Sequence, residues 1–381
     1  MRHTLTVLAC VLVVLACEVV EARRLQMHKF AVKTIKSEDG DIFDCVDVYK
    51  QPSLETLSSK NHTIPIFGSH PPTSNHDSTK KLQVQQQWQR SIRCPRGTIP
   101  IRRSHAKDYG KSLPTSPLQR NGDVERALAY ASNHGPFHGV GAKIQSWEPK
   151  VEPNEYSMSY VTVMTASNPA APSFGELDTT DFVRAGWMVH PIYFGDNTSR
   201  LFVQWSNDDG ATTGCFNLDC DGFVQTSSNI ALGASLHPLS VYNKTDEQYF
   251  ITVNIYLDAS QSRWCVSVQE EELGYWPVHK LFPQFINAPF VTWGGEVLNT
   301  WPGGQHTTTQ MGNGHFAEEG RVLASTAFDL TVTSARDNAS YVYAPGFFQD
   351  SPTCYDTDYY GMDPYYFIFG GPGGHNCSKA N

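Results

Sequence analysis

The segment Phe182-Val183-Arg184-Ala185-Gly186-Trp187-Met188-Val189 is typical of the stretches that decide the fold of this 381-residue chain. Similar runs, rich in Val, Ile, Phe, Tyr, Trp and Thr and separated by Gly, Asn, Asp and Pro, cover residues 158–165, 201–205, 250–257, 264–269, 321–333 and 365–369. Several alternate with period two, and no amphipathic helix longer than roughly ten residues stands out. Many short strands joined by frequent turns predict an all-β fold, an antiparallel, jelly-roll-like β-sandwich.

A second stretch, Thr292-Trp293-Gly294-Gly295-Glu296, places a carboxylate after two glycines in an apolar run. Glycine lets the backbone approach a ligand closely, so this pattern suggests an acid presented at a cleft. The alternative is a solvated Glu296 at a strand end, with the glycines forming a bulge.

The first 22 residues resemble a secretory signal peptide, with a short basic start, an apolar core and small residues before the cleavage position. That core is too short to span a bilayer, and no later apolar stretch is long enough, so we expect no membrane anchor. Five sequons accord with a secreted glycoprotein, at Asn61, Asn197, Asn243, Asn338 and Asn376. The formal net charge is −9 without a basic stripe, so nucleic acid is not an expected partner.

The mature chain divides into a small unit, a linker and a main domain. In residues 23–103 a turn at 37–41 precedes an alternating segment at 42–49, which predicts a hairpin in a small β-containing unit. So short a unit has a marginal core and is expected to pack on the rest of the protein. Residues 104–123, rich in Lys, Ser, Pro, Gly and Arg, predict a linker, and 124–381 form the main domain.

Seven of the nine cysteines remain after the signal segment: Cys45, Cys94, Cys215, Cys220, Cys265, Cys354 and Cys377. In an oxidising compartment most of them should pair, and an odd number leaves one over. A bridge between Cys45 and Cys94 would staple the small unit, and a bridge between Cys354 and Cys377 would tie down the C-terminus. Cys265 lies in an apolar run and is predicted to be a buried free thiol.

Neither a metal site nor another cofactor site is expected. Cys215 and Cys220 have the spacing of half a zinc site, but no second Cys or His pair completes it, so a small disulfide-closed loop is favoured. His306 and His315 lack a third His or a carboxylate at ligand spacing, which favours solvated or hydrogen-bonded histidines.

Several motifs of this chain are shared with a known family. In the small unit they are Asp44-Cys45-Val46-Asp47-Val48-Tyr49-Lys50-Gln51-Pro52 and Cys94-Pro95-Arg96-Gly97-Thr98. In the main domain they are Trp147-Glu148-Pro149, Ala185-Gly186-Trp187, Gly274-Tyr275-Trp276-Pro277, Trp293-Gly294-Gly295-Glu296, residues 306–316 and Phe369-Gly370-Gly371-Pro372-Gly373. On these motifs the chain resembles the neprosin family of plant secreted glutamic peptidases over nearly its whole mature length.

The resemblance implies a propeptide removed in acid, a β-sandwich domain, and cleavage after proline by two glutamates. The disulfides that it implies join Cys45 to Cys94, Cys215 to Cys220 and Cys354 to Cys377, leaving Cys265 alone. Trp187, Trp293 and Gln310 lie in matched motifs and are the expected substrate-binding residues. The expected partners are proline-containing peptides or cell-wall glycoproteins, in the cell wall, the apoplast or the vacuole.

The resemblance breaks at one position. Glu296 matches the family's second catalytic glutamate, but Arg184 stands directly before Ala-Gly-Trp, where the first belongs. Two facing carboxylates share acid and base roles, whereas arginine stays charged and is no base. Beside Glu296 it should lower that carboxylate's pKa and form a charge-assisted pair. Asp181, at an odd offset, should face the other side of the strand. The chain is therefore expected to be an impaired or inactive peptidase that still binds peptides.

Two other classes of function remain open. The protein is a carbohydrate- or cell-wall-binding module if Trp187 and Trp293 line a groove and stack on sugar rings. It is a structural extracellular protein if no cleft lies beside Glu296. Buried tryptophans would count against the carbohydrate reading.

Overall fold

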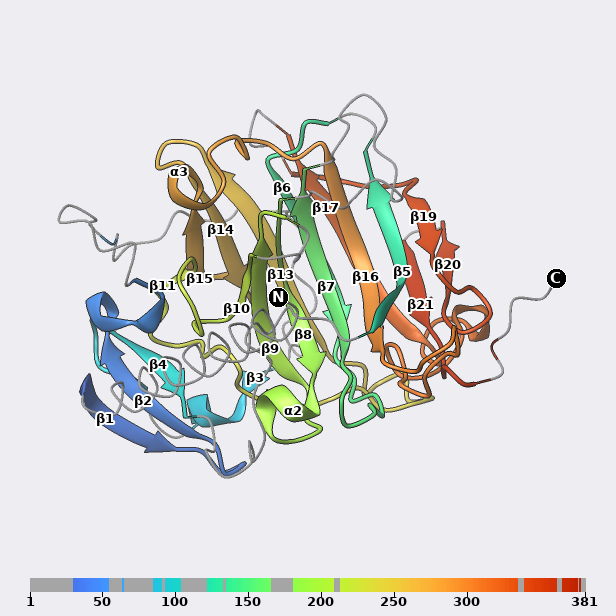
Figure 1. The fold of residues 1–381 in the computed structure, drawn as a ribbon, viewed down its shortest axis with the longest axis horizontal. Helices are drawn as coiled ribbons and strands as arrows, with labels where there is room; N and C mark the ends of the chain where they lie inside the picture. Colours follow the sequence, from blue (N-terminus) through green and yellow to red (C-terminus); the bar gives the residue numbers. More distant parts are fainter. Residues whose placement is uncertain are drawn as a thin grey trace, which may run out of the picture.

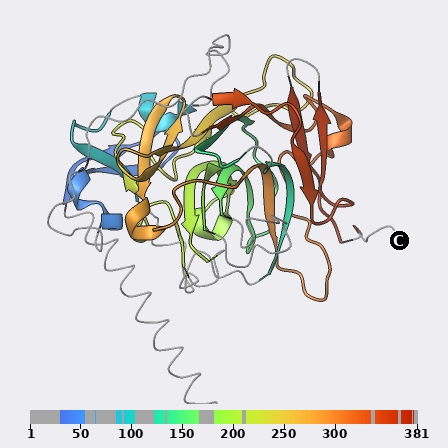
Figure 2. The same ribbon diagram turned by 90° about the horizontal axis from the view of Figure 1, so that it is seen from above.

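A computed structural model describes residues 30–54, 64, 85–90, 93–103, 122–132, 135–165, 181–208, 213–334, 339–361, 365–375 and 377. Its main part consists of two antiparallel sheets packed face to face, visible from the front in Figure 1 and from above in Figure 2. The predicted all-β sandwich is therefore confirmed.

The first sheet has seven strands. They are β5 (Asp123–Ala131), β7 (Ser157–Met164), β8 (Phe182–Val189), β9 (Arg200–Ser206), β10 (Cys215–Phe216), β16 (Phe290–Asn299) and β19 (Gly346–Gln349). Their order across the sheet is β10-β9-β8-β7-β16-β5-β19. Strand β7 thus lies between β8 and β16, so Arg184 and Glu296 come from strands on either side of it.

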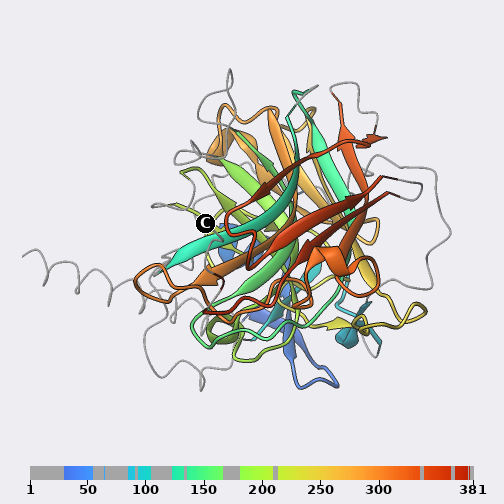
Figure 3. The same ribbon diagram turned by 90° about the vertical axis from the view of Figure 1, so that its right-hand side faces the viewer.

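The second sheet has nine strands. They are β6 (Gly139–Gln145), β11 (Val224–Gln225), β13 (Phe250–Asp258), β14 (Arg263–Val268), β15 (Glu271–Pro277), β17 (Ser325–Thr333), β18 (Ala339–Tyr341), β20 (Asp356–Tyr360) and β21 (Tyr366–Gly370). Their order is β11-β15-β14-β13-β6-β17-β21-β20, with β18 beside β17. The C-terminal strands, red in the figures, lie at the right-hand edge in Figure 1 and face the viewer in Figure 3.

Helical structure within the described residues is limited to short turns. They are α2 (Pro191–Phe194), α3 (Val278–Leu281) and the 3-10 turns η2 (Val48–Lys50), η3 (Pro52–Leu54), η5 (Gln87–Arg90) and η7 (Ala317–Glu319). This agrees with the absence of a long amphipathic pattern in the sequence. Within the same part of the chain, no helix has the length and hydropathy needed to cross a membrane.

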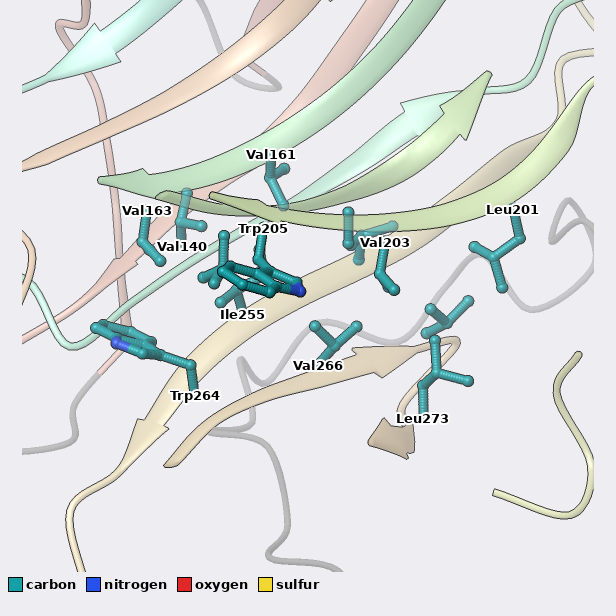
Figure 4. Close-up of a cluster of buried hydrophobic side chains, with 14 of the residues drawn as sticks. Val140, Val161, Val163, Leu201, Val203, Trp205, Ile255, Trp264, Val266 and Leu273 are labelled. Atoms are coloured by element: carbon teal, nitrogen blue, oxygen red, sulfur yellow. The ribbon is translucent and has the colours of Figure 1, made fainter. Parts of the chain in front are cut away.

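The main core lies between the two sheets. On β8, Val183, Ala185 and Trp187 alternate with their neighbours and join this core. Figure 4 shows valines of the first sheet, such as Val161 and Val203, meeting aliphatic and tryptophan side chains of the second. Full burial of such a side chain stabilises a protein by about 1.5–3 kcal/mol. Because side chains alternate along a strand, the face that carries these apolar residues is the one that turns inward.

The small N-terminal unit is a second, separate sheet. Strands β1 (Ala31–Lys36), β2 (Ile42–Asp47) and β4 (Thr98–Arg102) pair in the order β1-β2-β4, and the predicted hairpin is β1–β2. A disulfide joins Cys45 to Cys94. In Figure 1 this unit, drawn in blue, lies against the lower left of the sandwich.

Buried polar contacts attach the small unit to the sandwich. Asp41 accepts hydrogen bonds from Arg102 of its own unit at 2.8 Å and from Arg200 of β9 at 2.7 Å. The side-chain amide of Gln51 donates to the backbone oxygen of Gln225 at 3.1 Å and accepts from its N–H at 2.8 Å. Strand β3 (Gln85–Gln86) also pairs with β12 (Leu236–His237). The expected packing of the unit on the rest of the protein is therefore present.

The cysteines follow the expectations in part. A disulfide joins Cys215 to Cys220, and Cys265 is a buried thiol. The expected bridge between Cys354 and Cys377 is not formed. The two thiols are hydrogen-bonded to each other, and Cys354 Sγ also lies 3.5 Å from the carbonyl oxygen of Cys377. A hydrogen bond between the two thiols and one from a thiol to a backbone oxygen are present where a covalent bond was expected.

Several expectations fall wholly or partly outside the described residues. These concern the signal segment 1–22, most of the linker 104–123, and the sequons at Asn61, Asn338 and Asn376. Of the other two sequons, Asn197 and Asn243 are both exposed, as glycosylation requires.

Candidate active site

Strand β16 carries Glu296 on the face of the seven-stranded sheet that points away from the second sheet. Trp293 of this strand belongs to the core between the sheets, and Leu298 belongs to a separate apolar cluster. Because side chains alternate along a strand, Glu296 shares the outer face with Leu298. A Cβ at Gly294, whose φ is +144°, would lie 2.3 Å from the carbonyl oxygen of Ala127. This glycine therefore allows β16 to pack against β5.

Arg184 reaches Glu296 across β7. Its Nη1 lies 2.9 Å from Oε2 and its Nη2 lies 3.2 Å from Oε1 of Glu296, which makes a two-pronged ion pair. Its Nε donates to Gln204 Oε1 at 2.5 Å. The exposed fractions are 5% for Arg184 and 1% for Glu296. The reading of Glu296 as a solvated side chain at a strand end is therefore wrong.

Three further donors surround the carboxylate of Glu296. The hydroxyl of Tyr156 donates to Oε1 at 2.9 Å, and that of Tyr160 donates to Oε2 at 3.1 Å. Arg126 Nε lies 3.4 Å from Oε2. Each carboxylate oxygen thus accepts from a phenol and a guanidinium, which stabilises the ionised form.

The pKa shifts around this carboxylate follow from burial and charge. Burial, followed by the negative charge of Glu296, raises the pKa of Tyr160 far above its ordinary value, so the phenol keeps its proton. Burial opposes the charge on Arg184, but Glu296 and the two tyrosines outweigh it and raise the pKa of Arg184. The guanidinium also lies 4.7 Å from the ring centre of Tyr160, a favourable cation–π distance. The carboxylate of Glu296 is therefore surrounded by hydrogen-bond donors, of which Arg184 and Tyr160 keep their protons.

A second carboxylate lies near the site, beyond Arg126. Asp350 accepts the backbone N–H of Arg126 at 2.9 Å, and its Oδ2 lies 3.9 Å from Arg126 Nη1. Burial raises the pKa of Asp350, Arg126 lowers it, and the charge of Glu296 raises it further. In the described part of the chain its connection to Glu296 runs through this guanidinium. Asp181 directly precedes β8, and its backbone N–H donates to the hydroxyl of Thr165 at 2.9 Å.

Two of the three expected substrate-binding residues, Trp187 and Trp293, cannot contact a substrate, so that part of the prediction is wrong. Trp187 and Trp293 are fully buried between the sheets, where their indole N–H groups donate to backbone oxygens of β6. Each lies three residues from Arg184 or Glu296 on the same strand, and an odd offset places a side chain on the opposite face. Gln310 is half-buried and accepts from the backbone N–H of Lys150 at 3.0 Å.

His306 and His315 are both hydrogen-bonded to carboxylates, and each has its own partner. His306 Nδ1 lies 3.0 Å from Glu125, and His315 Nδ1 lies 3.0 Å from Glu319. Within the described residues, one group of side chains has its ligand atoms close enough to hold a metal ion: those of Glu125, His306 and Cys354 lie within 4.8 Å of one another.

Tyr156, Tyr160 and Arg126 were missed by the sequence analysis. Tyr160 lies in a predicted strand. A tyrosine in a buried strand needs a hydrogen-bond partner for its hydroxyl, and this could have indicated a polar site nearby. Arg126 faces Glu296 because these two residues are paired in the register of β5 and β16. Strand register was not predictable from the alternation of either strand alone.

Two family models match this chain. The family model for neprosin matches residues 153–372, and the model for the neprosin activation peptide matches residues 34–134. Among solved structures, SCP-B, a member of the eqolisin family of peptidases in complex with the tripeptide Ala-Ile-His, is 10% identical, with a TM-score of 0.32. The match covers 67% of this chain and 100% of that one. A family 16 glycoside hydrolase of Bacteroides ovatus in complex with a product is 8% identical over 46% of this chain and 66% of that one, with a TM-score of 0.24.

The antiparallel sandwich, which carries a buried acid on the outer face of one sheet, has a glutamic-peptidase-like fold. Among proteins of that fold the chain belongs to the neprosin family, and it carries the family's N-terminal activation peptide.

Proposed function

We propose that this protein is a secreted neprosin-family member in which Arg184 replaces the first catalytic glutamate, so that the site binds peptides and has little or no peptidase activity. The observation that supports this proposal is the buried, two-pronged ion pair between Arg184 and Glu296. A guanidinium in this position stays protonated at every working pH.

The chemistry of peptide hydrolysis needs a proton acceptor for water and a proton donor for the leaving amine. Two carboxyl groups with separated pKa values supply both roles. Of the groups that contact Glu296, Arg184 and Tyr160 have raised pKa values and keep their protons, so neither of them can replace the missing carboxyl group. Loss of one general acid or base lowers a rate by about 10²–10⁴-fold.

The proposed ligands are proline-containing peptides or cell-wall glycoproteins outside the cell, as the family resemblance implies. The carbohydrate-binding alternative relied on Trp187 and Trp293 as stacking platforms, and both are buried. No observation favours it over peptide binding.

The test compares acid-treated wild-type protein with Arg184→Glu on a proline-containing peptide between pH 3 and 7. We expect Arg184→Glu to cleave at least about 10²-fold faster, because it restores a second carboxyl group. Its matched control is the double variant Arg184→Glu/Glu296→Gln, which should lose the gain. Wild-type cleavage at a rate comparable to Arg184→Glu, abolished by Glu296→Gln or by Asp350→Asn, would overturn the proposal.

A further inference from the structure

We propose that the outer face of the seven-stranded sheet holds a binding site for a free carboxylate, formed by Gln204, Arg184, Thr162 and Thr292. This inference deepens the proposed function and rests on it, since it names the chemical class of ligand that the altered site binds. A peptide that ends in a free carboxyl group has this chemistry.

The four side chains form one row across four neighbouring strands. In the sheet register, Gln204 of β9 is paired with Arg184 of β8, Arg184 with Thr162 of β7, and Thr162 with Thr292 of β16. Paired residues of antiparallel strands point to the same face, with Cβ atoms about 4.5–5.5 Å apart. The row therefore lies on the face that carries Glu296, and on β16 Thr292 is two same-face positions away from Glu296.

Polar groups of this row have no partner within the described part of the chain. The side-chain amide nitrogen of Gln204 and the hydroxyls of Thr162 and Thr292 are shielded from solvent and make no hydrogen bond there. The exposed fractions of these residues are 1%, 1% and 0%. The amide orientation of Gln204 is fixed because its oxygen accepts from Arg184 Nε.

Arg184 also has hydrogen-bonding capacity to spare. A guanidinium carries five N–H groups, and one bond to Gln204 and two to Glu296 use three of them. Buried polar groups in folded proteins are nearly always paired, so a row of unpaired donors calls for a missing acceptor. Guanidinium, amide and hydroxyl groups together suit an oxygen anion that accepts several hydrogen bonds.

The local charge also favours an anion. Two guanidinium groups, those of Arg184 and Arg126, contact the single carboxylate of Glu296. Asp350 lies on the far side of Arg126 and has a raised pKa, so it neutralises this excess of positive charge less completely as the pH falls. The planar fork of arginine matches a carboxylate, which is the anion at the C-terminus of an ordinary peptide. The ligand class that fits both donors and charge is therefore a carboxylate.

The test measures binding of the tripeptide Ala-Ala-Pro as its free acid and as its C-terminal amide, by calorimetry at pH 6 on the full chain. We expect the free acid to bind at least about tenfold more tightly, since hydrogen bonds to a charged group are the stronger ones. In Thr162→Val and Thr292→Val we expect the free acid to bind about tenfold more weakly, with unchanged thermal stability without ligand. Neither substitution removes a hydrogen bond found in the described structure.

Thr252→Val is the matched control, because the Thr252 hydroxyl is likewise shielded and unpaired but lies on β13 in the other sheet. It should leave binding unchanged. Equal binding of acid and amide, or unchanged binding in both row variants, would contradict the carboxylate site while leaving the proposed function intact. Rapid cleavage by the wild-type protein would contradict the proposed function instead. Absence of binding by either peptide would overturn the carboxylate site.

Discussion

A single side chain, Arg184, determines which groups can exchange protons with the buried acid Glu296. The two form a two-pronged ion pair, and the other donors to the carboxylate are two phenols and a second guanidinium. Removing one partner of such a pair leaves an uncompensated buried charge and typically costs about 3–5 kcal/mol. The donors around Glu296 therefore stabilise its charged form.

His190, next to this site, should make the protein less stable in acid. Its ring lies 5.6 Å from that of Tyr156, and its Nδ1 is shielded and unpaired within the described residues. Burial lowers the pKa of His190 to about 4, whereas an unfolded histidine titrates near 6.5. The unfolded chain thus binds this proton more readily, so stability is fully present above about pH 6.5 and is lost as the pH falls toward 4.

Denaturant unfolding of wild type and His190→Phe at pH 7 and pH 4.5 measures this effect. The wild type should lose up to about 3 kcal/mol more than the variant over this interval. Asp181→Asn is a control of opposite sign, because burial followed by Asp208 raises the pKa of Asp181 to about 6. Protonation of Asp181 favours the folded state below pH 6, so Asp181→Asn should steepen the acid loss. Equal pH dependence in wild type and His190→Phe would contradict the assignment.

At the scale of single strands, the sequence predicted the class of elements and which side chains face inward, but not the register between strands. Alternation along 182–189 implies that Trp187 lies opposite to Arg184, so the placement of Trp187 at the substrate was avoidable. The contact of Arg126 with Glu296 was not predictable, because it depends on how β5 pairs with β16. The contact of Arg184 with Glu296 came from the family resemblance, since no local pattern relates residues 112 positions apart.

The attachment of the N-terminal unit to the sandwich should depend on Asp41. This carboxylate is 3% exposed and accepts from Arg102 and Arg200, which also pairs with Asp196. Asp41→Asn leaves two buried guanidinium groups with less compensation, and we expect a loss of about 3–5 kcal/mol in the docking of the unit. Hydrogen exchange of strands β1 and β2, followed by mass spectrometry, measures that docking.

Asp44→Asn is the matched control for Asp41→Asn. Asp44 forms its ion pair with Arg103 inside the small unit, and that arginine side chain is 33% exposed. The control should speed exchange much less, because a partly exposed pair contributes about 0–1 kcal/mol. Similar acceleration in both variants would show that the unit unfolds by itself and is not released from the sandwich.

At the scale of the whole molecule, Trp187 and Trp293 connect the two sheets. A substitution at Trp293 tests how much this connection stabilises the fold. The N–H of Trp293 donates to the carbonyl oxygen of Gly141 on β6 at 2.9 Å, so it bonds one layer of the sandwich to the other. Trp293→Phe removes this bond and leaves a cavity, and we expect a loss of about 2–4 kcal/mol in the free energy of unfolding. Trp301→Phe, at a side chain that is 40% exposed, should change it by less than about 0.5 kcal/mol. Unfolding of both variants by guanidinium chloride measures the free energy of unfolding, and peptide and glycan binding are measured in parallel. A Trp293→Phe variant of unchanged stability that fails to bind its ligand would place Trp293 in a binding surface and not in the core.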